Sequence, residues 1–290
     1  MQNFTSSRTR FLYSHLLPDS KRTPTDDDPL GHGTFVASKA VGRINGVARN
    51  GILIAVKSTR KLSDVIAALD QTILDVATHG QGRNPSVVVC TLAIKKKWRR
   101  NAWMPPIKDR LWAIFRDQLT VLGQMNTVVV ISGGNSADRA GESQVSNFEF
   151  PKLFRNDETL PVIVASATNQ HGQPANWAQS LESMREVWAP GEMLRGATIG
   201  DGDRFTECSG SSGTAGVVCS FDGSQIEPSL TVMSGRWTHY LLSRHGATPM
   251  GSNGFLAASQ SRGYSQVVEI VFSSDLTTHQ HIGCASVEPD

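Results

Sequence analysis

The sequence lacks the features that mark several classes of protein. No stretch reaches the roughly 18 consecutive apolar residues that a transmembrane helix requires, and residues 1–8 have no apolar core of the kind that a signal peptide carries. The formal net charge is only +2, which is too small to indicate a nucleic acid or an anionic membrane as a partner. We therefore expect neither of these partners, and the sequence leaves the oligomeric state open.

Cysteine is scarce, with four in 290 residues. None forms a Cys-x-x-Cys pair, the spacing typical of zinc sites and thioredoxin-like redox centres. Cys208 and Cys219 could be bridged, although the sequence alone leaves the pairing open. His279 and His281 form a single His-x-His near a polar terminus, which favours solvated side chains over metal ligands. We predict no metal ion and no cofactor.

What the sequence does contain is an ordinary globular composition, with 39% hydrophobic and 19% charged residues. Short runs rich in Val and Ile alternate with helical patterns, which predicts a mostly parallel sheet with helices on both faces. The near-continuous apolar content of the runs is typical of strands buried on both sides. The predicted strands are residues 52–57, 87–92, 128–131 and 162–165, and the predicted helices cover residues 63–79 and 111–122.

The pattern changes after residue 219. Ser, Gly, Thr and Gln dominate the rest of the chain, and the helical periodicity fades. The apolar run at residues 267–272 is compatible with one strand. We therefore assign residues 1–218 to one domain and leave residues 219–290 unassigned.

The most specific segment is the string G-H-G-T-F-V-A at residues 31–37, which contains His32. A histidine between two glycines at the start of a helix is held close to the backbone, with room for a partner on each side. This arrangement suits an imidazole that takes a proton from one neighbour and is oriented by another.

The string resembles the histidine motif of the subtilisin-like serine proteases, and further landmarks of that family follow in order. They are G-V-A at residues 46–48, I-A-V-K at 54–57, a strand ending in G-G-N at 133–135, V-I-V-A-S-A at 162–167 and A-P-G at 189–191. The resemblance covers residues 26–216 and is greatest to fungal secreted members. It implies a three-layer α/β fold, a secreted or extracellular location, and a peptide or protein substrate.

The resemblance also implies roles for individual residues. His32 would be the general base, and the side-chain amide of Asn135 would hold the oxyanion. Thr91, Leu92 and Ala93 stand where the family has a substrate-binding Ser-Leu-Gly. The methyl group of Ala93 would crowd an extended peptide that pairs with that edge.

The serine motif departs from the Gly-Thr-Ser of the family. Matching residues 210–212 to it keeps Ser212 as the nucleophile, whereas matching residues 212–215 to Ser-Gly-Thr-Ser places Ala215 at that position. Both alignments stay open. Turn-forming residues at 220–224 follow so closely that we expect no long buried helix behind the serine.

The triad acid is also missing from its expected place. In the family the aspartate ends a buried strand upstream of the histidine, and residues 1–31 contain no such strand. We interpret Asp19, Asp26, Asp27 and Asp28 as surface loop residues. The domain is therefore predicted to be incomplete at both ends, with an exposed apolar sheet edge where a central strand is absent.

These observations predict a subtilisin-like serine endopeptidase domain that works through a Ser-His-Asp acyl-enzyme mechanism but has little or no turnover in this form. The alternative is a pseudoprotease that binds extended peptides or a protein partner without cutting them. A nucleotide-binding domain and an α/β-hydrolase are disfavoured, because no Gly-x-Gly-x-x-Gly opens a helix and no Gly-x-Ser-x-Gly is present.

Overall fold

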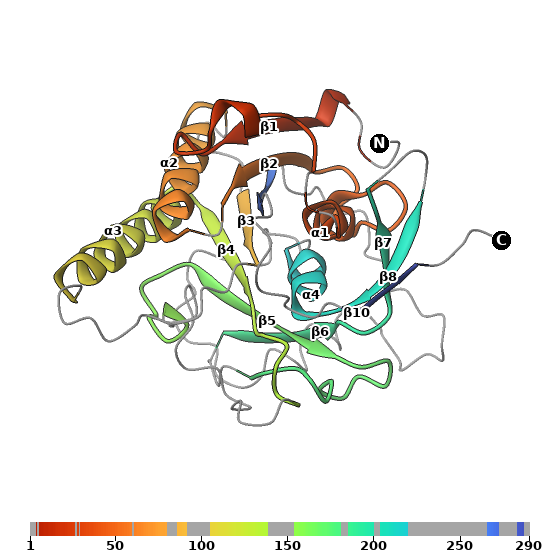
Figure 1. Ribbon diagram of the computed structural model, residues 1–290. Coiled ribbons are helices and arrows are strands. Elements are labelled where there is room, and N and C mark those ends of the chain that lie inside the picture. The colour runs from red at the N-terminus through yellow and green to blue at the C-terminus, as the bar shows by residue number, and fades with distance from the viewer. Residues whose placement is uncertain are drawn as a thin grey trace.

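The computed structural model describes residues 4, 6–26, 28, 30–59, 61–79, 86–91, 105–138, 154–180, 185–199, 204–219, 266–272 and 283–286. A parallel sheet runs through the middle of the molecule, with helices on both sides (Figure 1). Its strands, in spatial order, are β1 (Thr9–Tyr13), β2 (Ile52–Ser58), β9 (Gln266–Phe272), β3 (Ser86–Cys90), β4 (Thr127–Ser132), β5 (Val162–Thr168) and β6 (Glu186–Pro190).

In the described residues, four helices cover the two faces of this sheet. They are α1 (His32–Val41), α2 (Leu62–His79), α3 (Pro105–Gln124) and α4 (Ser211–Val218), and short 3-10 turns lie at Ser6–Arg8 and Asp19–Lys21. A small antiparallel sheet lies beyond α1 and α4 (Figure 1). It consists of β7 (Leu194–Ala197), β8 (Phe205–Ser209) and β10 (Gly283–Ser286).

Successive residues of the central strands face opposite helical layers. Val87 and Val89 of β3 belong to an apolar cluster with α1 and α4, whereas Val88 and Cys90 belong to a second cluster with α2 and α3. This follows from the strand geometry, because successive side chains point to opposite sides of a sheet. The predicted α/β class with a mostly parallel, doubly covered sheet is confirmed.

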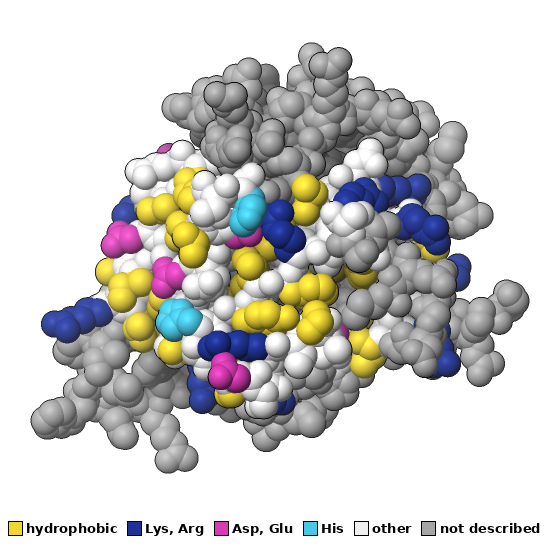
Figure 2. Space-filling view, turned by 90° about the horizontal axis from the view of Figure 1, so that it is seen from above, with side chains coloured by type: hydrophobic (Ala, Val, Ile, Leu, Met, Phe, Trp, Pro, Cys, Tyr) yellow, Lys and Arg dark blue, Asp and Glu magenta, His cyan; other side chains and the backbone are white. Residues whose placement is uncertain are grey.

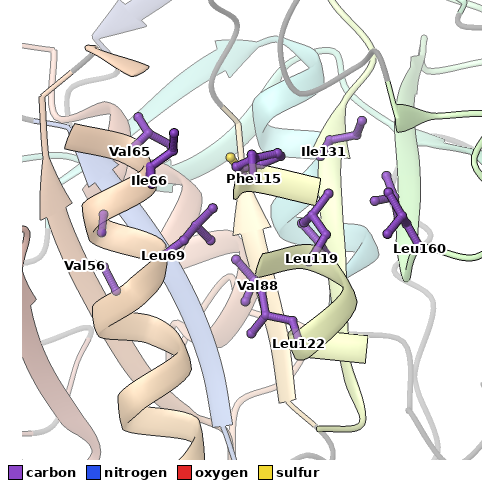
Figure 3. Close-up of a cluster of buried hydrophobic side chains, with 14 of the residues drawn as sticks. Val56, Val65, Ile66, Leu69, Val88, Phe115, Leu119, Leu122, Ile131 and Leu160 are labelled. Carbon is purple, nitrogen blue, oxygen red and sulfur yellow. The ribbon is translucent and has the colours of Figure 1, made fainter. Parts of the chain in front are cut away.

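The second cluster fills the space between α2, α3 and the sheet (Figure 3). Phe115, Leu119 and Leu122 recur at helical spacing along α3 and are each 0% exposed. They meet Leu69 and its neighbours on α2 above Val56 and Val88 of the strands. The predicted apolar stripe on α3 is therefore confirmed at these positions, while Leu111 at its start is only partly buried.

Two of the acidic residues before α1 do not lie in a solvated loop. The side chain of Asp26 accepts hydrogen bonds from the N–H of Thr34 at 3.0 Å and from its hydroxyl at 2.6 Å. Asp28 is 7% exposed, and its carboxylate accepts from the N–H of Leu30 at 3.1 Å. The interpretation of both as surface loop residues was wrong: Asp26 accepts from the first turn of α1, whose N–H groups lack partners within the helix, and Asp28 is buried in the turn before it.

Replacing Asp26 by alanine should lower the free energy of unfolding by about 1 kcal/mol, the usual loss for a helix-capping side chain. Urea unfolding monitored by circular dichroism measures this change. Asp26→Asn keeps one acceptor oxygen and should lose less. Asp19→Ala is the matched control, because that side chain is 92% exposed. If the two alanine variants lost equal stability, Asp26 would not be acting as a cap.

The sheet does not have the open edge that the sequence predicted within its centre. Residues 266–272 form β9, which pairs in parallel with β2 on one side and with β3 on the other. At the outer edge, β1 pairs only with β2 in the described part of the chain. The apolar run after residue 219 therefore supplies the strand that local sequence reasoning could not place.

The cysteine pairing also differs from the pair considered above. Cys219 and Cys90 are buried and not disulfide-bonded, whereas Cys208 is disulfide-bonded. In the small sheet, β10 places Cys284 directly opposite Cys208 in register. A bridge between Cys208 and Cys219 is therefore excluded.

Candidate active site

The candidate catalytic residues lie on the segments that follow parallel strands or begin helices. Thr91 follows the last residue of β3, and Asn135 comes three residues after the end of β4. His32 is the first residue of α1, and Ser212 is the second residue of α4. In a sheet of this kind, chemistry gathers where the carboxyl ends of the strands meet the first turns of the helices.

Helices α1 and α4 pack closely and run in the same direction. A Cβ atom added to Gly213 would lie 3.0 Å from Cε1 of Phe35, and one added to Gly216 would lie 2.8 Å from the carbonyl oxygen of Val36. The contact nearer the carboxyl end of α4, at Gly216, is also the one nearer the carboxyl end of α1, at Val36. The first turns of the two helices therefore lie at the same end of the pair. The small residues of α4 therefore bring the helix that begins at His32 alongside the helix that carries Ser212 (Figure 1).

The residue before His32 has a conformation that suits glycine. Gly31 has a φ angle of 60° and caps α1 in the left-handed region, which side chains other than glycine, asparagine and aspartate rarely adopt. A Cβ atom there would lie 2.9 Å from Cγ2 of Ile199. The first glycine of the motif is therefore required by the turn that places His32 at the helix start.

Asn135 is held by the residue next to Ser212. The N–H and the hydroxyl of Ser211 both donate to Oδ1 of Asn135, at 2.9 and 2.7 Å. The hydroxyl oxygen of Ser211 in turn accepts from the N–H of Gly134 at 3.0 Å. A backbone N–H can only donate, so this contact fixes which side of the amide carries the oxygen. The NH₂ group of Asn135 is therefore turned away from Ser211.

A second donor lies in the same place. The N–H of Ser212 makes no hydrogen bond within the described part of the chain, while the Ser212 side chain is buried, with 6% of the residue exposed. The N–H groups at the start of α4 also carry the positive end of the helix dipole. The N–H of Ser212 is thus a second donor in the turn that binds Asn135 through Ser211.

The turn before α4 is anchored from another strand. The N–H of Gly210 donates to the carbonyl oxygen of Gly191 at 2.8 Å, and Gly191 directly follows β6. The Ala-Pro-Gly landmark therefore holds the serine turn in place, which is the role of a scaffold segment.

Comparison with known proteins identifies the family. The sequence profile of the Subtilase family matches residues 6–232. This chain belongs to the subtilase family of serine proteases. Two fungal subtilases are similar to it: Subtilisin-like protease 1 of Pseudogymnoascus destructans, 25% identical over 187 residues, and the Alkaline proteinase of Hapsidospora chrysogena, 24% identical over 193 residues. Each alignment covers 64% of this chain and 40% of the relative, so the chain spans less than half of their length.

Solved structures agree with the fold. The crystal structure of a lanthipeptide protease is 14% identical to this subtilase domain, covers 91% of it and 79% of its own chain, and has a TM-score of 0.53. At this level of identity the similarity concerns the arrangement of strands and helices. It supports the three-layer architecture described above.

The structure places Asn135 against Ser211, the residue before Ser212. Ser212 is the second residue of α4, whereas Ala215 lies fully buried within this helix. Thr91 is 7% exposed, and its carbonyl oxygen accepts from the hydroxyl of Ser132 at 3.4 Å. Leu92 and Ala93 lie outside the described residues, as do His279 and His281.

Two features of the site were missed. We expected no long buried helix behind the serine, and α4 is indeed short, but it is a helix from Ser211 to Val218 and all but one of its residues are buried. A helix built from Ser, Gly, Thr and Ala and enclosed on every side has no apolar stripe, so periodicity cannot reveal it. Ser211 was also overlooked as the residue that orients Asn135, and only its position between Gly210 and Ser212 hinted at this role.

The described residues carry two further findings. They contain no group of three or more His, Cys, Asp or Glu side chains placed to hold a metal ion. None of the described helices is long and apolar enough to cross a membrane. On the face seen in Figure 2, acidic and basic side chains both lie among hydrophobic ones.

Proposed function

We propose that this chain recognises extended peptides and forms an acyl-enzyme at Ser212, with His32 as the base and with Asn135 and the Ser212 N–H as the oxyanion donors. The observation that carries the proposal is the contact between Ser211 and Oδ1 of Asn135, because it fixes the orientation of the amide and leaves its NH₂ group to donate elsewhere, as an oxyanion donor must. A pre-set donor of this kind has little value in a purely structural turn.

The chemistry follows from these positions. The Ser212 hydroxyl oxygen attacks the peptide carbonyl carbon, and its proton passes to His32. The C–N bond then breaks, and His32 returns the proton to the leaving amine. Water, deprotonated by the same imidazole, hydrolyses the ester and restores Ser212. Both oxyanion donors act on the carbonyl oxygen in each of the two steps.

Turnover is expected to be low, because residues 1–31 carry no counterpart of the strand-ending aspartate that the family has upstream of its histidine. Asp26 caps α1 through Thr34, and Asp28 accepts from the backbone of Leu30. In subtilisin, a member of the same family, loss of the triad aspartate reduces turnover about 3 × 10⁴-fold. The lack of that aspartate in residues 1–31 favours the second candidate function, a subtilase that binds peptides and cleaves them very slowly.

A fluorophosphonate probe should label Ser212 covalently, because phosphonylation needs the nucleophile and the oxyanion donors but no leaving-group amine. Intact-mass measurement and peptide mapping detect the adduct. Ser212→Ala should abolish the label, and Ser209→Ala, in the strand before the site, should retain it. Labelling of the Ser212→Ala variant at the parent rate would refute the assignment of the nucleophile.

The same preparation separates the two functions. Hydrolysis of fluorescent casein that is lost in Ser212→Ala supports the protease, whereas peptide binding by fluorescence anisotropy without cleavage supports the binding protein. Absence of both labelling and peptide binding would contradict the proposal as a whole.

A further inference from the structure

An interior strand of the large sheet, the third of its seven strands, comes from the last part of the described chain. Along its full length β9 pairs with β2, from Gln266 opposite Ile52 to Phe272 opposite Ser58. Its first half also pairs with β3, up to Glu269 opposite Val89. No other strand of this sheet in the described chain follows residue 219.

Without β9 the described sheet would be divided. One part would consist of β1 and β2, and the other of β3, β4, β5 and β6. The facing edges of β2 and β3 would then hold unpaired backbone N–H and C=O groups inside the protein, which is costly. The space between these edges is therefore a slot with hydrogen-bonding groups on both sides.

The slot also has apolar walls above and below. Leu53 and Val87 lie toward α1 and α4, whereas Ile54 and Val88 lie toward α2 and α3. Such a slot accepts an extended segment that runs parallel to its neighbours and is apolar on both faces. The sequence Q-V-V-E-I-V-F of β9 meets this requirement at most of its positions.

The slot is linked to the candidate active site through a helix. α1 packs against β9, and its first residue is His32. A second connection follows β9 in the chain, since β10 pairs with β8 and places Cys284 opposite the disulfide-bonded Cys208. The segment that fills the slot is therefore held on its carboxyl side as well.

We propose that residues 266–272 are a donated strand that occupies a strand-binding slot between β2 and β3 of the same chain and thereby fixes α1, and with it His32. The slot recognises its occupant by parallel backbone pairing and by apolar side chains on both faces. Formation of the site then depends on the insertion of this strand. The catalytic part of this inference rests on the proposed function, whereas the strand placement does not.

Paired cysteines test the placement. Ile54 and Val268 are register partners, and adjacent strands lie about 4.8 Å apart, within the roughly 4.4–6.8 Å that a disulfide spans between Cα atoms. The double variant Ile54→Cys/Val268→Cys, made with Cys90→Ala and Cys219→Ala, should form an intrachain disulfide that peptide mapping identifies. The matched control Ile54→Cys/Ile270→Cys shifts the partner two residues, about 6.6 Å along the strand, and should not.

The outcomes decide between occupants. A disulfide found only between chains would show that a second copy supplies the strand, and equal cross-linking of the two variants would show that there is no defined register; either result overturns the proposal. Hydrogen exchange of the unaltered full chain gives a second measurement, in which the amides of 266–272 should be protected as strongly as those of β4. Rapid exchange at 266–272 would overturn the proposal even if the cysteine variants failed to fold.

The cross-link and the exchange rates are read by mass, so they report on the strand whether or not Ser212 reacts. If the strand is in place and the fluorophosphonate does not label Ser212, the proposed function fails and the donated strand stands. If Ser212 is labelled but residues 266–272 do not occupy the slot, the proposed function stands and the donated strand fails.

Discussion

Replacing Phe115 by alanine should lower the free energy of unfolding by about 3–5 kcal/mol, the usual range for a fully buried aromatic side chain. Phe115 is 0% exposed, and its ring centroid lies 5.6 Å from that of Phe154. Its side chain lies in the apolar cluster that α3 forms with α2 and the strands (Figure 3). Because the surrounding strands are fixed by their hydrogen bonds, they cannot move in to fill the cavity.

The adjacent residue provides the control for this change. Ile114 is 45% exposed, so Ile114→Ala in the same turn of α3 should change stability by only about 0.5 kcal/mol. Urea unfolding of the two variants measures the difference. Equal m-values for the two variants check that the unfolded states are comparable. Equal losses for Phe115→Ala and Ile114→Ala would contradict the described packing of α3.

Lys39 alone should raise the free energy of unfolding by about 3 kcal/mol between pH 8 and pH 10.5. This follows from about 1.36 kcal/mol for each unit by which its pKa differs between the folded and unfolded protein. Lys39 is 6% exposed, and its Nζ donates to the carbonyl oxygen of Arg195 at 3.1 Å. Burial lowers the pKa of Lys39 from 10.5 to about 8. Between these values the unfolded chain binds a proton that the folded chain does not, so stability increases with pH.

Below pH 8 Lys39 is protonated in both the folded and the unfolded protein. The folded protein then bears the full free-energy cost of burying the ammonium group. Lys39→Met should therefore raise the free energy of unfolding at pH 7 by about 2–3 kcal/mol, since a thioether of similar length avoids the cost of a buried charge. The difference between parent and variant should shrink as the pH approaches 10.5. Lys61→Met, at an exposed position, is the control and should give a small difference that does not vary with pH.

The opposite result for Lys39→Met has a clear meaning. A loss of stability at pH 7, constant with pH, would show that the hydrogen bond to Arg195 outweighs the cost of burial. Because other lysines and tyrosines titrate near pH 10, the comparison must use the difference between variant and parent at each pH.

The elements that the sequence predicted are those with a local pattern. The apolar runs of β2, β3, β4 and β5 and the stripes of α2 and α3 repeat at periods that a few neighbouring residues reveal. Because these strands alternate with helices along the chain, they are expected to form one sheet with helices on both faces. The family landmarks add His32 and Asn135, whose positions depend on short strings of adjacent residues.

The rest depends on residues that are distant in the sequence. Asp26 caps α1 by a contact eight residues along the chain, and β9 is defined by strands that precede it by most of the chain. No window of neighbouring residues contains that information. Ser211 illustrates the same limit within the site, since its importance lies in a bond to Asn135 from another segment.

The position of β9 has a consequence for how this protein is made. The ribosome synthesises residues 266–272 after every other strand of the large sheet in the described chain, yet they lie in its interior, between β2 and β3. During translation the nascent chain therefore carries two partial sheets with open, facing edges, which are prone to bind other strands. Pairings between residues so far apart in sequence form slowly. The core closes only once this segment has left the ribosome.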